Sequence, residues 1–302
     1  MPTPTAVVER VFGAMGGTAR VVVVGGSDTL LDSAQARIAE LESRWSRFIS
    51  TSEISQLNAH RGLPLLVSAD TYLLIECACT GWRLTQGAFD PSILDAMTQL
   101  GYDETFSEVR QRTFTTPVAT TERAPGCGGI ALDSIVGTIT LPLETGFDPG
   151  GIGKGLAADL VSRELCDAGA AGALVSLGGD LRVRGCSPRG DQDWRIAVED
   201  PDDAGTIVAE LDIVDGGVAT TSTTSRTWTR GGRSVHHVID PRTGAPTSSS
   251  VRAVTVAAAD AWSAEVFAKA ALVAGEGAID LLERAGLQGV VVTDTGAVKV
   301  AA

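Results

Sequence analysis

The sequence has no apolar run long enough to cross a membrane. Its apolar stretches are strand-sized, as in Val21–Val24, whereas a spanning helix needs roughly 20 apolar residues. The first 17 residues also lack a basic stretch followed by an apolar one, and they contain no cysteine that a lipid could modify. We therefore expect a cytoplasmic protein without a membrane span.

Basic clusters are missing as well. The 302 residues include 24 Lys and Arg against 37 Asp and Glu, so the formal net charge is −13. An acidic protein repels a phosphate backbone unless a local run of Lys and Arg overrides its field, and the sequence has no such run. The composition therefore argues against nucleic acid as a partner.

The sequence also lacks a disulfide framework. Its five cysteines are an odd number, and no secretory signal accompanies them, so we expect reduced thiols. Cys77 and Cys79 are two residues apart on a predicted helix and therefore point to different faces of it. This spacing favours buried small side chains over a metal-chelating pair.

Apolar residues and glycine are abundant. Apolar residues make up 44% of the chain and charged residues 20%, which is typical of a globular protein with a sizeable core. The 35 glycines show no collagen period, so they indicate many tight turns or close backbone contacts. No internal repeat or linker divides the chain, and we expect one α+β domain over residues 1–302, with antiparallel-rich sheets flanked by helices.

Apolar periodicity places the elements along the chain. It predicts helices over residues 28–45, 69–86, 155–168, 262–274 and 277–285. Strands are predicted over residues 18–25, 206–213, 233–240 and 252–258, with two or three more between residues 172 and 198. Two hairpins are expected at residues 128–141 and 289–300, and residues 107–126 are expected to be irregular.

A glycine-rich loop before the third predicted helix carries the strongest local signal. In FDPGGIGKGLAADLV, residues 147–161, four glycines expose backbone N–H groups around Lys154, an arrangement that favours an anion. It is not a Walker A loop, because that motif has Gly where this chain has Asp148 and Ser or Thr where this chain has Gly155. A strand-to-helix turn with a surface lysine is the alternative.

Two further segments could contribute polar groups. In HHVIDPRTGAP, residues 236–246, one of two adjacent histidines can face a pocket, and His237 with Asp240 could then contact a substrate. An Asx-turn following a strand is the alternative. In SLGGDLRVRG, residues 176–185, Asp180 follows two glycines, which is a weak signal by itself.

Seven segments in order resemble the FAD-dependent protein FMN transferases known as the ApbE family or flavin transferases. They are MGG at 15–17, RFISTSEISQLN at 47–58, GAFDPS at 87–92, DPGGIGKGLAAD at 148–159, SLGGDLRVRG at 176–185, GVATTS at 217–222 and HHVIDPRTG at 236–244. The resemblance covers nearly the whole chain, and it implies an ApbE-like fold.

The resemblance also implies an activity and a set of site residues. Such an enzyme cleaves the pyrophosphate of FAD, attaches FMN to a Ser or Thr of an acceptor flavoprotein and releases AMP. The acceptor motif is Asp-x-x-(Ser/Thr)-Gly-Ala-(Ser/Thr). His237 is the candidate for activating the acceptor hydroxyl, and Lys154 for offsetting pyrophosphate charge. The residues expected to contact FAD are Met15, Phe48, Ala88, Phe89, Asp90, Asp148, Lys154, Gly179, Asp180, His237, Ile239, Asp240 and Thr243.

The expected metal site departs from the family pattern. Family members bind Mg²⁺ through an Asp and a Thr four residues apart on a helix, together with a main-chain carbonyl of the glycine loop, here assigned to Gly151. This chain has Glu265 and Lys269 at the two helix positions. Glu265 could still coordinate Mg²⁺, but a protonated Lys269 cannot. We therefore expect Lys269, held by Glu265, to take part in catalysis in place of the metal; a plain helix salt bridge between the two is the alternative.

Two other functions remain open from the sequence alone. An FAD pyrophosphatase would use water in place of the acceptor and give free FMN and AMP. A non-catalytic FAD-binding protein would leave FAD intact.

Overall fold

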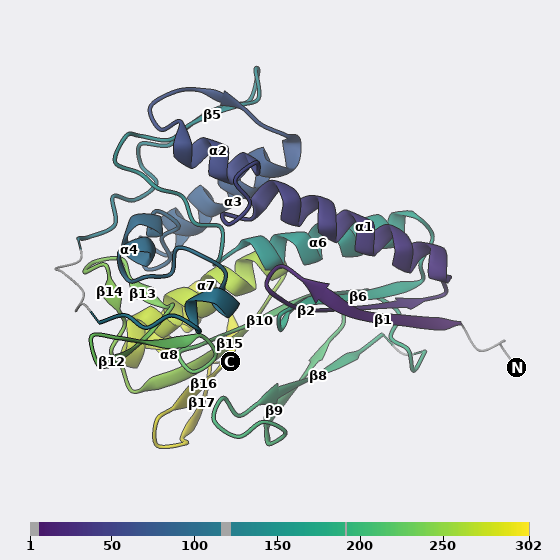
Figure 1. The fold of residues 1–302 in the computed structure, drawn as a ribbon. Helices are drawn as coiled ribbons and strands as arrows, with labels where there is room; N and C mark the ends of the chain where they lie inside the picture. The colour runs from purple at the N-terminus through teal and green to yellow at the C-terminus, as the bar shows by residue number, and fades with distance from the viewer. Residues whose placement is uncertain (1–5, 116–121, 191, 302) are drawn as a thin grey trace, which may run out of the picture.

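An eight-stranded antiparallel sheet forms the centre of the protein (Figure 1). The computed structural model describes residues 6–115, 122–190 and 192–301. The strands lie in the order β1 (Val7–Ala14), β2 (Gly17–Val24), β6 (Gly172–Leu177), β7 (Asp180–Gly185), β10 (Gly216–Ser222), β15 (Val251–Ala258), β16 (Gln288–Thr293) and β17 (Val298–Ala301).

Helices cover one face of this sheet in two layers. Helix α6 (Gly153–Asp167) packs on β6 and β7, and α7 (Ala261–Ala274) packs on β10 and β15. Helix α1 (Asp28–Trp45) packs beside α6 and on β1 and β2, and α3 (Ala69–Leu84) lies outside α7. Helix α8 (Ala278–Ala285) packs beside α7 against β16 and β17. The two inner helices are therefore buried between the sheet and the outer helices.

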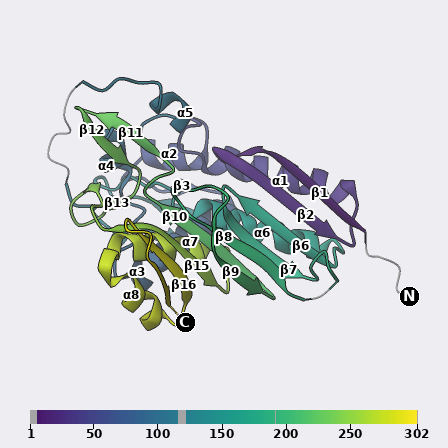
Figure 2. The same cartoon turned by 90° about the horizontal axis from the view of Figure 1, so that it is seen from below.

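The opposite face of the sheet is covered by a hairpin. Strands β8 (Trp194–Glu199) and β9 (Ile207–Ile213) pair with each other and lie below the sheet in Figure 1 and in front of it in Figure 2. In β8, buried and exposed residues alternate, as expected for a strand with one face on a core. Trp194 and Ile196 pack against Val22, Leu174 and Val183 of the sheet.

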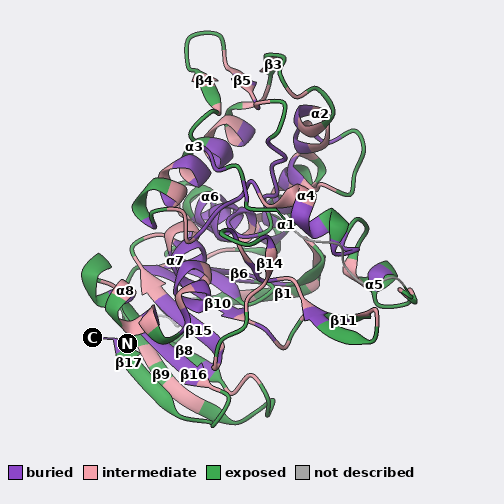
Figure 3. Ribbon diagram, turned by 90° about the vertical axis from the view of Figure 1, so that its left-hand side faces the viewer, coloured by how far each residue is buried: buried purple, intermediate pink, exposed green. Residues whose placement is uncertain are grey.

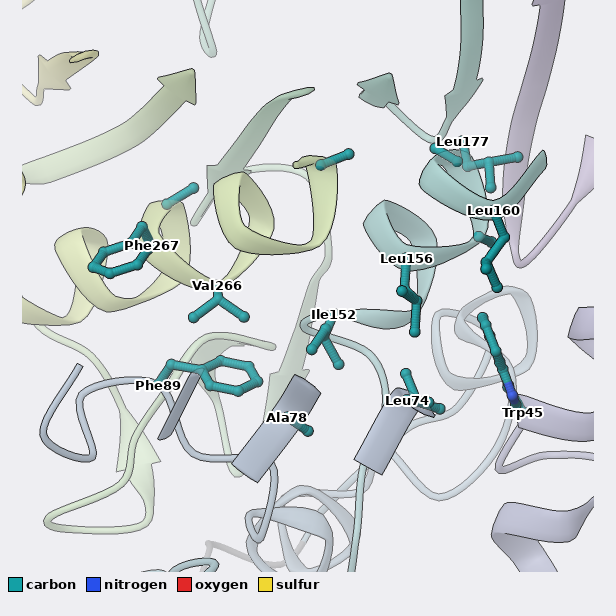
Figure 4. Packing of buried hydrophobic residues seen from close by; sticks show 14 of the residues in the cluster. Trp45, Leu74, Ala78, Phe89, Ile152, Leu156, Leu160, Leu177, Val266 and Phe267 are labelled. Carbon is teal, nitrogen blue, oxygen red and sulfur yellow. The ribbon is translucent and has the colours of Figure 1, made fainter. Parts of the chain in front are cut away.

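The main core lies between the sheet and the helices. Buried residues, purple in Figure 3, are concentrated on α6, α7 and the central strands. Figure 4 shows Phe89 and Val266 beside Ile152, where the loop before α6 meets α7 and α3. Phe89 is 2% exposed. This packing fixes the positions of the first turns of α6 and α7.

Short segments form a smaller cluster at one end of the molecule. Met97, Tyr102 and Val109 pack against Trp228 and Val235. These residues come from in and around α4 (Leu94–Gln99), α5 (Phe106–Val109), β11 (Thr227–Arg230) and β12 (Arg233–His236). The remaining short elements are α2 (Glu53–Ala59), β3 (Leu65–Leu66), β4 (Ala131–Asp133), β5 (Thr138–Thr140), β13 (Ile239–Asp240), β14 (Ala245–Pro246) and a 3₁₀ turn at Gly275–Gly277.

The structure confirms the predicted α+β class, the five predicted helices and both predicted hairpins. Strands β1 and β10 were missed, as were the shorter β3, β11 and β14 and helices α2, α4 and α5. The strand predicted over residues 233–240 is divided into β12 and β13. The segment 107–126 begins inside α5, and its residues 116–121 lie outside the described part of the chain.

Strand β10 was missed for a physical reason. It begins with Gly216 and Gly217, which lower strand propensity. A Cβ on Gly217 would lie 2.2 Å from the Cα of Ala261, so the strand needs glycine where the start of α7 approaches it.

Two smaller predictions were also checked. All five cysteines are free thiols, as predicted. Among the residues described by the structure, no helix is both long enough and apolar enough to span a bilayer.

Candidate active site

A pocket opens between the first turns of the inner helices and the short segments around α4 and α5. It brings together residues from seven separate stretches of the sequence. Its lining includes Met15, Trp45, Arg47, Phe48, Phe89, Asp90, Ile93, Met97, Tyr102, Phe106, Asp148, Gly151, Lys154, Arg226, His237 and Lys269.

The two inner helices cap each other at this pocket. Neither α6 nor α7 has an acidic residue in its own first turn. Asp159 of α6 accepts hydrogen bonds from the backbone N–H groups of Ala261 and Trp262, each at 2.9 Å, and Glu265 of α7 accepts one from Gly155 at 2.9 Å. Each carboxylate therefore satisfies free N–H groups at the other helix's positive end.

Gly155 permits this contact. A Cβ at this position would lie 2.4 Å from the carbonyl oxygen of Ala261. Glycine is therefore required at position 155 by the packing of α6 against α7, whereas the sequence had suggested that this glycine lets the backbone approach a ligand.

Four charged residues of α6, β7 and α7 form what we call the charged end of the pocket: Lys154, Asp180, Glu265 and Lys269. Lys154 and Lys269 belong to the pocket lining, and Asp180 and Glu265 contact Lys154. The Lys154 ammonium donates to Asp180 and, at 2.5 Å, to Oε1 of Glu265. Burial lowers the pKa of Lys154, but the two carboxylates outweigh this effect and hold its pKa above the ordinary value. The charge of Lys154 is therefore already matched within the protein.

Lys269 lies in the pocket but is not held by Glu265, so this part of the prediction was wrong. Both oxygens of Glu265 are taken by Lys154 and the Gly155 N–H, and the helix salt bridge is not formed either. The Lys269 side chain runs instead past Gly151, where its Cδ and Cε would each lie 3.1 Å from an added Cβ. In the described part of the chain, no residue forms a hydrogen bond or ion pair with the Lys269 ammonium.

The residues at the expected metal site do not fit a divalent cation. The two oxygens of Glu265 are occupied by donors, and Lys269 brings an ammonium group to the second ligand position beside Gly151. No group of three or more His, Cys, Asp or Glu residues suited to a metal ion occurs among the described residues. A hard cation needs several free oxygen ligands, which this arrangement does not offer.

His237 lines the pocket, whereas its neighbour His236 turns away. The ring of His236 bonds through Nε2 to the carbonyl oxygen of Thr247 at 3.0 Å. Nδ1 of His237 is buried and has no hydrogen-bond partner among the described residues. Burial, followed by Lys269 and Arg226, lowers the pKa of His237 well below its ordinary value. The ring is therefore neutral near pH 7 and able to accept a proton.

The other end of the pocket, which we call the aromatic end, consists of Phe48, Tyr102 and Phe106 with two arginines. The Arg47 guanidinium lies 4.2 Å from the ring centre of Phe48 and 4.7 Å from that of Tyr102. Arg47 also pairs with Asp148 at 3.3 Å, and Arg226 donates to the Tyr102 hydroxyl at 3.3 Å. Sequence reasoning identified Phe48 and Asp148 but missed the other residues.

The remaining expected FAD contacts divide into two groups. Met15 and Asp90 line the pocket, as does Phe89, although its ring belongs mainly to the core. Asp180 contacts Lys154 behind the pocket wall. The others are absent from the lining: Ala88, Gly179, Ile239, Asp240 and Thr243. Asp240 instead pairs with Arg242 at 2.8 Å, and Ile239 is buried in the cluster around Trp228.

Comparison with known proteins identifies the family. The sequence model of the ApbE family matches residues 15–291, which is most of the chain. The chain belongs to the ApbE family. This match independently supports the resemblance to the family that the seven ordered segments showed.

Several curated relatives of this ApbE-family chain are named FAD:protein FMN transferase. The FAD:protein FMN transferase of Haemophilus influenzae is 26% identical over 275 residues, covering 88% of this chain and 78% of the relative. The one from Vibrio cholerae is 27% identical over 256 residues, covering 84% and 75%.

Solved structures agree on the fold. The crystal structure of the ApbE protein of Thermotoga maritima has a TM-score of 0.83 and 25% identity, covering 97% of this chain and 96% of that one. The apo flavinyl transferase ApbE of Pseudomonas stutzeri has a TM-score of 0.80 and 24% identity, covering 100% and 96%.

Proposed function

We propose that this ApbE-family chain transfers FMN from FAD to a hydroxyl group of an acceptor protein and releases AMP. The observation that carries the proposal is the composition of the pocket. It combines an aromatic end, a half-buried neutral histidine and an unpaired lysine in one cavity. FAD has matching parts: a flat flavin ring and an anionic pyrophosphate. The names of the curated relatives support the same activity.

The aromatic end is suited to a flat ring. Phe48 is 37% exposed, so its ring is available to a ligand, and Tyr102 lies 5.9 Å away between ring centres. Stacking on such rings favours planar ligands. Arg226 adds positive charge close to these rings, which attracts the negatively charged part of FAD, whereas the charge of Arg47 is matched by Asp148.

The chemical step is a displacement at phosphorus. The acceptor hydroxyl oxygen attacks the phosphorus atom on the FMN side, a new P–O bond forms, and the P–O bond to the bridging oxygen breaks. That oxygen leaves with AMP. The imidazole of His237 takes the hydroxyl proton, for which its neutral state is required.

Product analysis tests this proposal. The protein is incubated with FAD and an acceptor domain that carries the Asp-x-x-Thr-Gly-Ala-Thr motif, with and without Mg²⁺. We expect AMP in solution and FMN bound to the acceptor threonine, detected by mass spectrometry. Free FMN with AMP would instead indicate an FAD pyrophosphatase, and intact FAD in both conditions would indicate a binding protein; either result would overturn the proposal.

A further inference from the structure

Lysine is scarce in this protein, and its placement is uneven. The sequence has three lysines, Lys154, Lys269 and Lys299, among 24 basic residues. Two of the three line the pocket, and Lys299 lies exposed on β17. The two pocket lysines differ in one respect. Lys154 is shared by two carboxylates, whereas no described residue neutralises the ammonium of Lys269 by direct contact.

Lys269 is half-buried in the pocket wall, and a partly desolvated cation without a partner is costly for a protein. Removing an ion from water requires compensating charge or hydrogen bonds close to it. Burial lowers the pKa of Lys269, and Lys154 adds to this effect, whereas the carboxylates of Glu265, Asp148 and Asp180 oppose it without contacting the ammonium. A bound anion beside the ammonium would supply the missing partner and stabilise the charged form. The site is thus arranged for an anionic group of a ligand.

The groups next to Lys269 are bound to other residues, so Lys269 is the residue available to bind the anionic group. Glu265 is 2% exposed, and its two oxygens are bound to the Lys154 ammonium and the Gly155 N–H. The hydrocarbon chain of Lys269 fills the space beside Gly151. The oxygen ligands that a divalent cation needs are therefore bound to other groups or replaced by an ammonium group.

We propose that Lys269 takes the place of a divalent cation in this pocket, so that the protein binds the pyrophosphate of FAD and cleaves it without a metal ion. The identity of the ligand in this inference rests on the proposed function. During transfer, negative charge grows on the bridging oxygen as its bond to the FMN phosphorus breaks. Lys269 keeps its proton and offsets that charge, while the acceptor proton goes to His237.

The first test compares the protein in EDTA and in Mg²⁺. FAD binding is measured by equilibrium dialysis, and AMP release and FMN transfer to the acceptor domain are measured in parallel. We expect the Kd for FAD to agree within about twofold in the two conditions, and transfer to continue in EDTA. Loss of binding or transfer in EDTA that Mg²⁺ restores would overturn the inference and leave the proposed function intact.

The same experiment separates the inference from the proposed function. If FAD binds equally well in EDTA and in Mg²⁺ but no AMP forms in either condition, the proposed function is overturned and metal-free binding is supported.

The second test removes the lysine. Lys269→Gln keeps a similar length and removes the charge, and we expect FAD binding in EDTA to weaken by about 10- to 100-fold, as for loss of a charge-assisted contact. Lys299→Gln is the matched control and should bind FAD as the unmodified protein does. Thermal melting followed by circular dichroism checks that both variants fold. Unchanged FAD affinity in a folded Lys269→Gln protein would contradict the inference.

A third test tries to create the metal dependence. Glu265→Asp combined with Lys269→Thr provides two oxygen donors four residues apart and removes the ammonium group. We expect this double variant to bind FAD more tightly with Mg²⁺ than in EDTA, whereas Glu265→Asp alone, which keeps Lys269, should show no such difference. Equal responses of the two variants to Mg²⁺ would count against the role of Lys269.

Discussion

The charged end and the aromatic end of the pocket are supported in different ways. The charged end is built on α6 and α7, whose first turns are buried in the main core and cap each other. The aromatic end is carried by short helices, loops and the β11–β12 hairpin, which pack in a smaller cluster. The comparison shows that one side of a pocket can be fixed by the main core while the other side is held by a separate, smaller cluster.

The two ends therefore contribute differently to the free energy of unfolding and to the affinity for FAD. At the charged end, substitutions of Lys154, Asp180 or Glu265 disturb buried ion pairs between α6, β7 and α7, whereas Lys269 takes part in none of these pairs. At the aromatic end, Phe48 is 37% exposed, so its removal should cost little stability, whereas Tyr102 is 4% exposed and belongs to the smaller cluster. The following predictions test this distinction, beginning with the largest expected effect.

His237 lies between the two ends, and its loss should cause the largest change in rate. We expect His237→Ala to slow FMN transfer by about 10²- to 10⁴-fold, because the acceptor hydroxyl loses its base. Single-turnover transfer measures the rate, and dialysis measures FAD affinity, which should change far less. His60→Ala, which changes an exposed histidine, is the control. A fall in affinity equal to the fall in rate would show that His237 mainly binds FAD.

At the charged end, we expect Glu265→Gln to destabilise the whole protein. The Gln oxygen can still accept from Gly155, but its amide NH₂ group would face the Lys154 ammonium. Breaking a buried ion pair on one side costs about 3–5 kcal/mol of the free energy of unfolding. Urea denaturation measures this loss, and Glu276→Gln at an exposed site should change it by less than about 0.5 kcal/mol. A loss as small as that of the control would mean that the mutual capping contributes little to stability.

At the aromatic end, we expect the opposite pattern for Phe48→Ala. Loss of one stacking ring should weaken FAD binding by about 10-fold. The free energy of unfolding should change by less than about 0.5 kcal/mol, because Phe48 is 37% exposed. Dialysis and urea denaturation measure the two quantities. If affinity is retained while stability falls, Phe48 supports the fold and does not contact the ligand.

The pH dependence of transfer should show the smallest effect, and it should depend on charged residues at both ends of the pocket. The pKa of His237 is lowered by burial and then by Lys269, Arg226, His236 and Lys154. A base acts in its neutral form, so a lowered pKa keeps His237 active below the ordinary histidine value of about 6.5.

We therefore expect kcat/KM for transfer to remain constant as the pH falls through about 6.5 and to decline only at lower pH. Arg226→Gln should move this decline to higher pH, because it removes one of the positive charges near the ring. A decline centred at the ordinary histidine pKa in the unmodified protein would contradict the structural origin of the shift.

Much of the fold follows from local sequence patterns. Helices α1, α6 and α7 were predicted because their apolar residues recur at helical spacing over many residues. Strand β1 was missed. Its residues are exposed or partly exposed, and the strand is held in the sheet by pairing with β2. Strand β10 was missed because its glycines are explained only by the approach of Ala261.

The site was predicted unevenly for a related reason. Lys154, Glu265 and Lys269 lie in recognisable segments, but their pairing depends on side-chain directions that the crossing of α6 and α7 determines. The spacing of Glu265 and Lys269 suggested a contact that packing beside Gly151 prevents. Tyr102 and Arg226 lie far apart in the sequence and outside every motif, so only the tertiary structure brings them together.

The mutual capping of α6 and α7 has a consequence for amide hydrogen exchange. The N–H groups of Gly155, Ala261 and Trp262 are bound by carboxylates from the opposite helix, so separating the helices would leave the donors and both carboxylates unpaired. These amides should become accessible to deuterium only when the whole protein unfolds, whereas those of the short β11–β12 hairpin should open locally. The slowest-exchanging amides of the molecule would then lie at the junction of α6 and α7, directly next to Lys154 of the pocket lining.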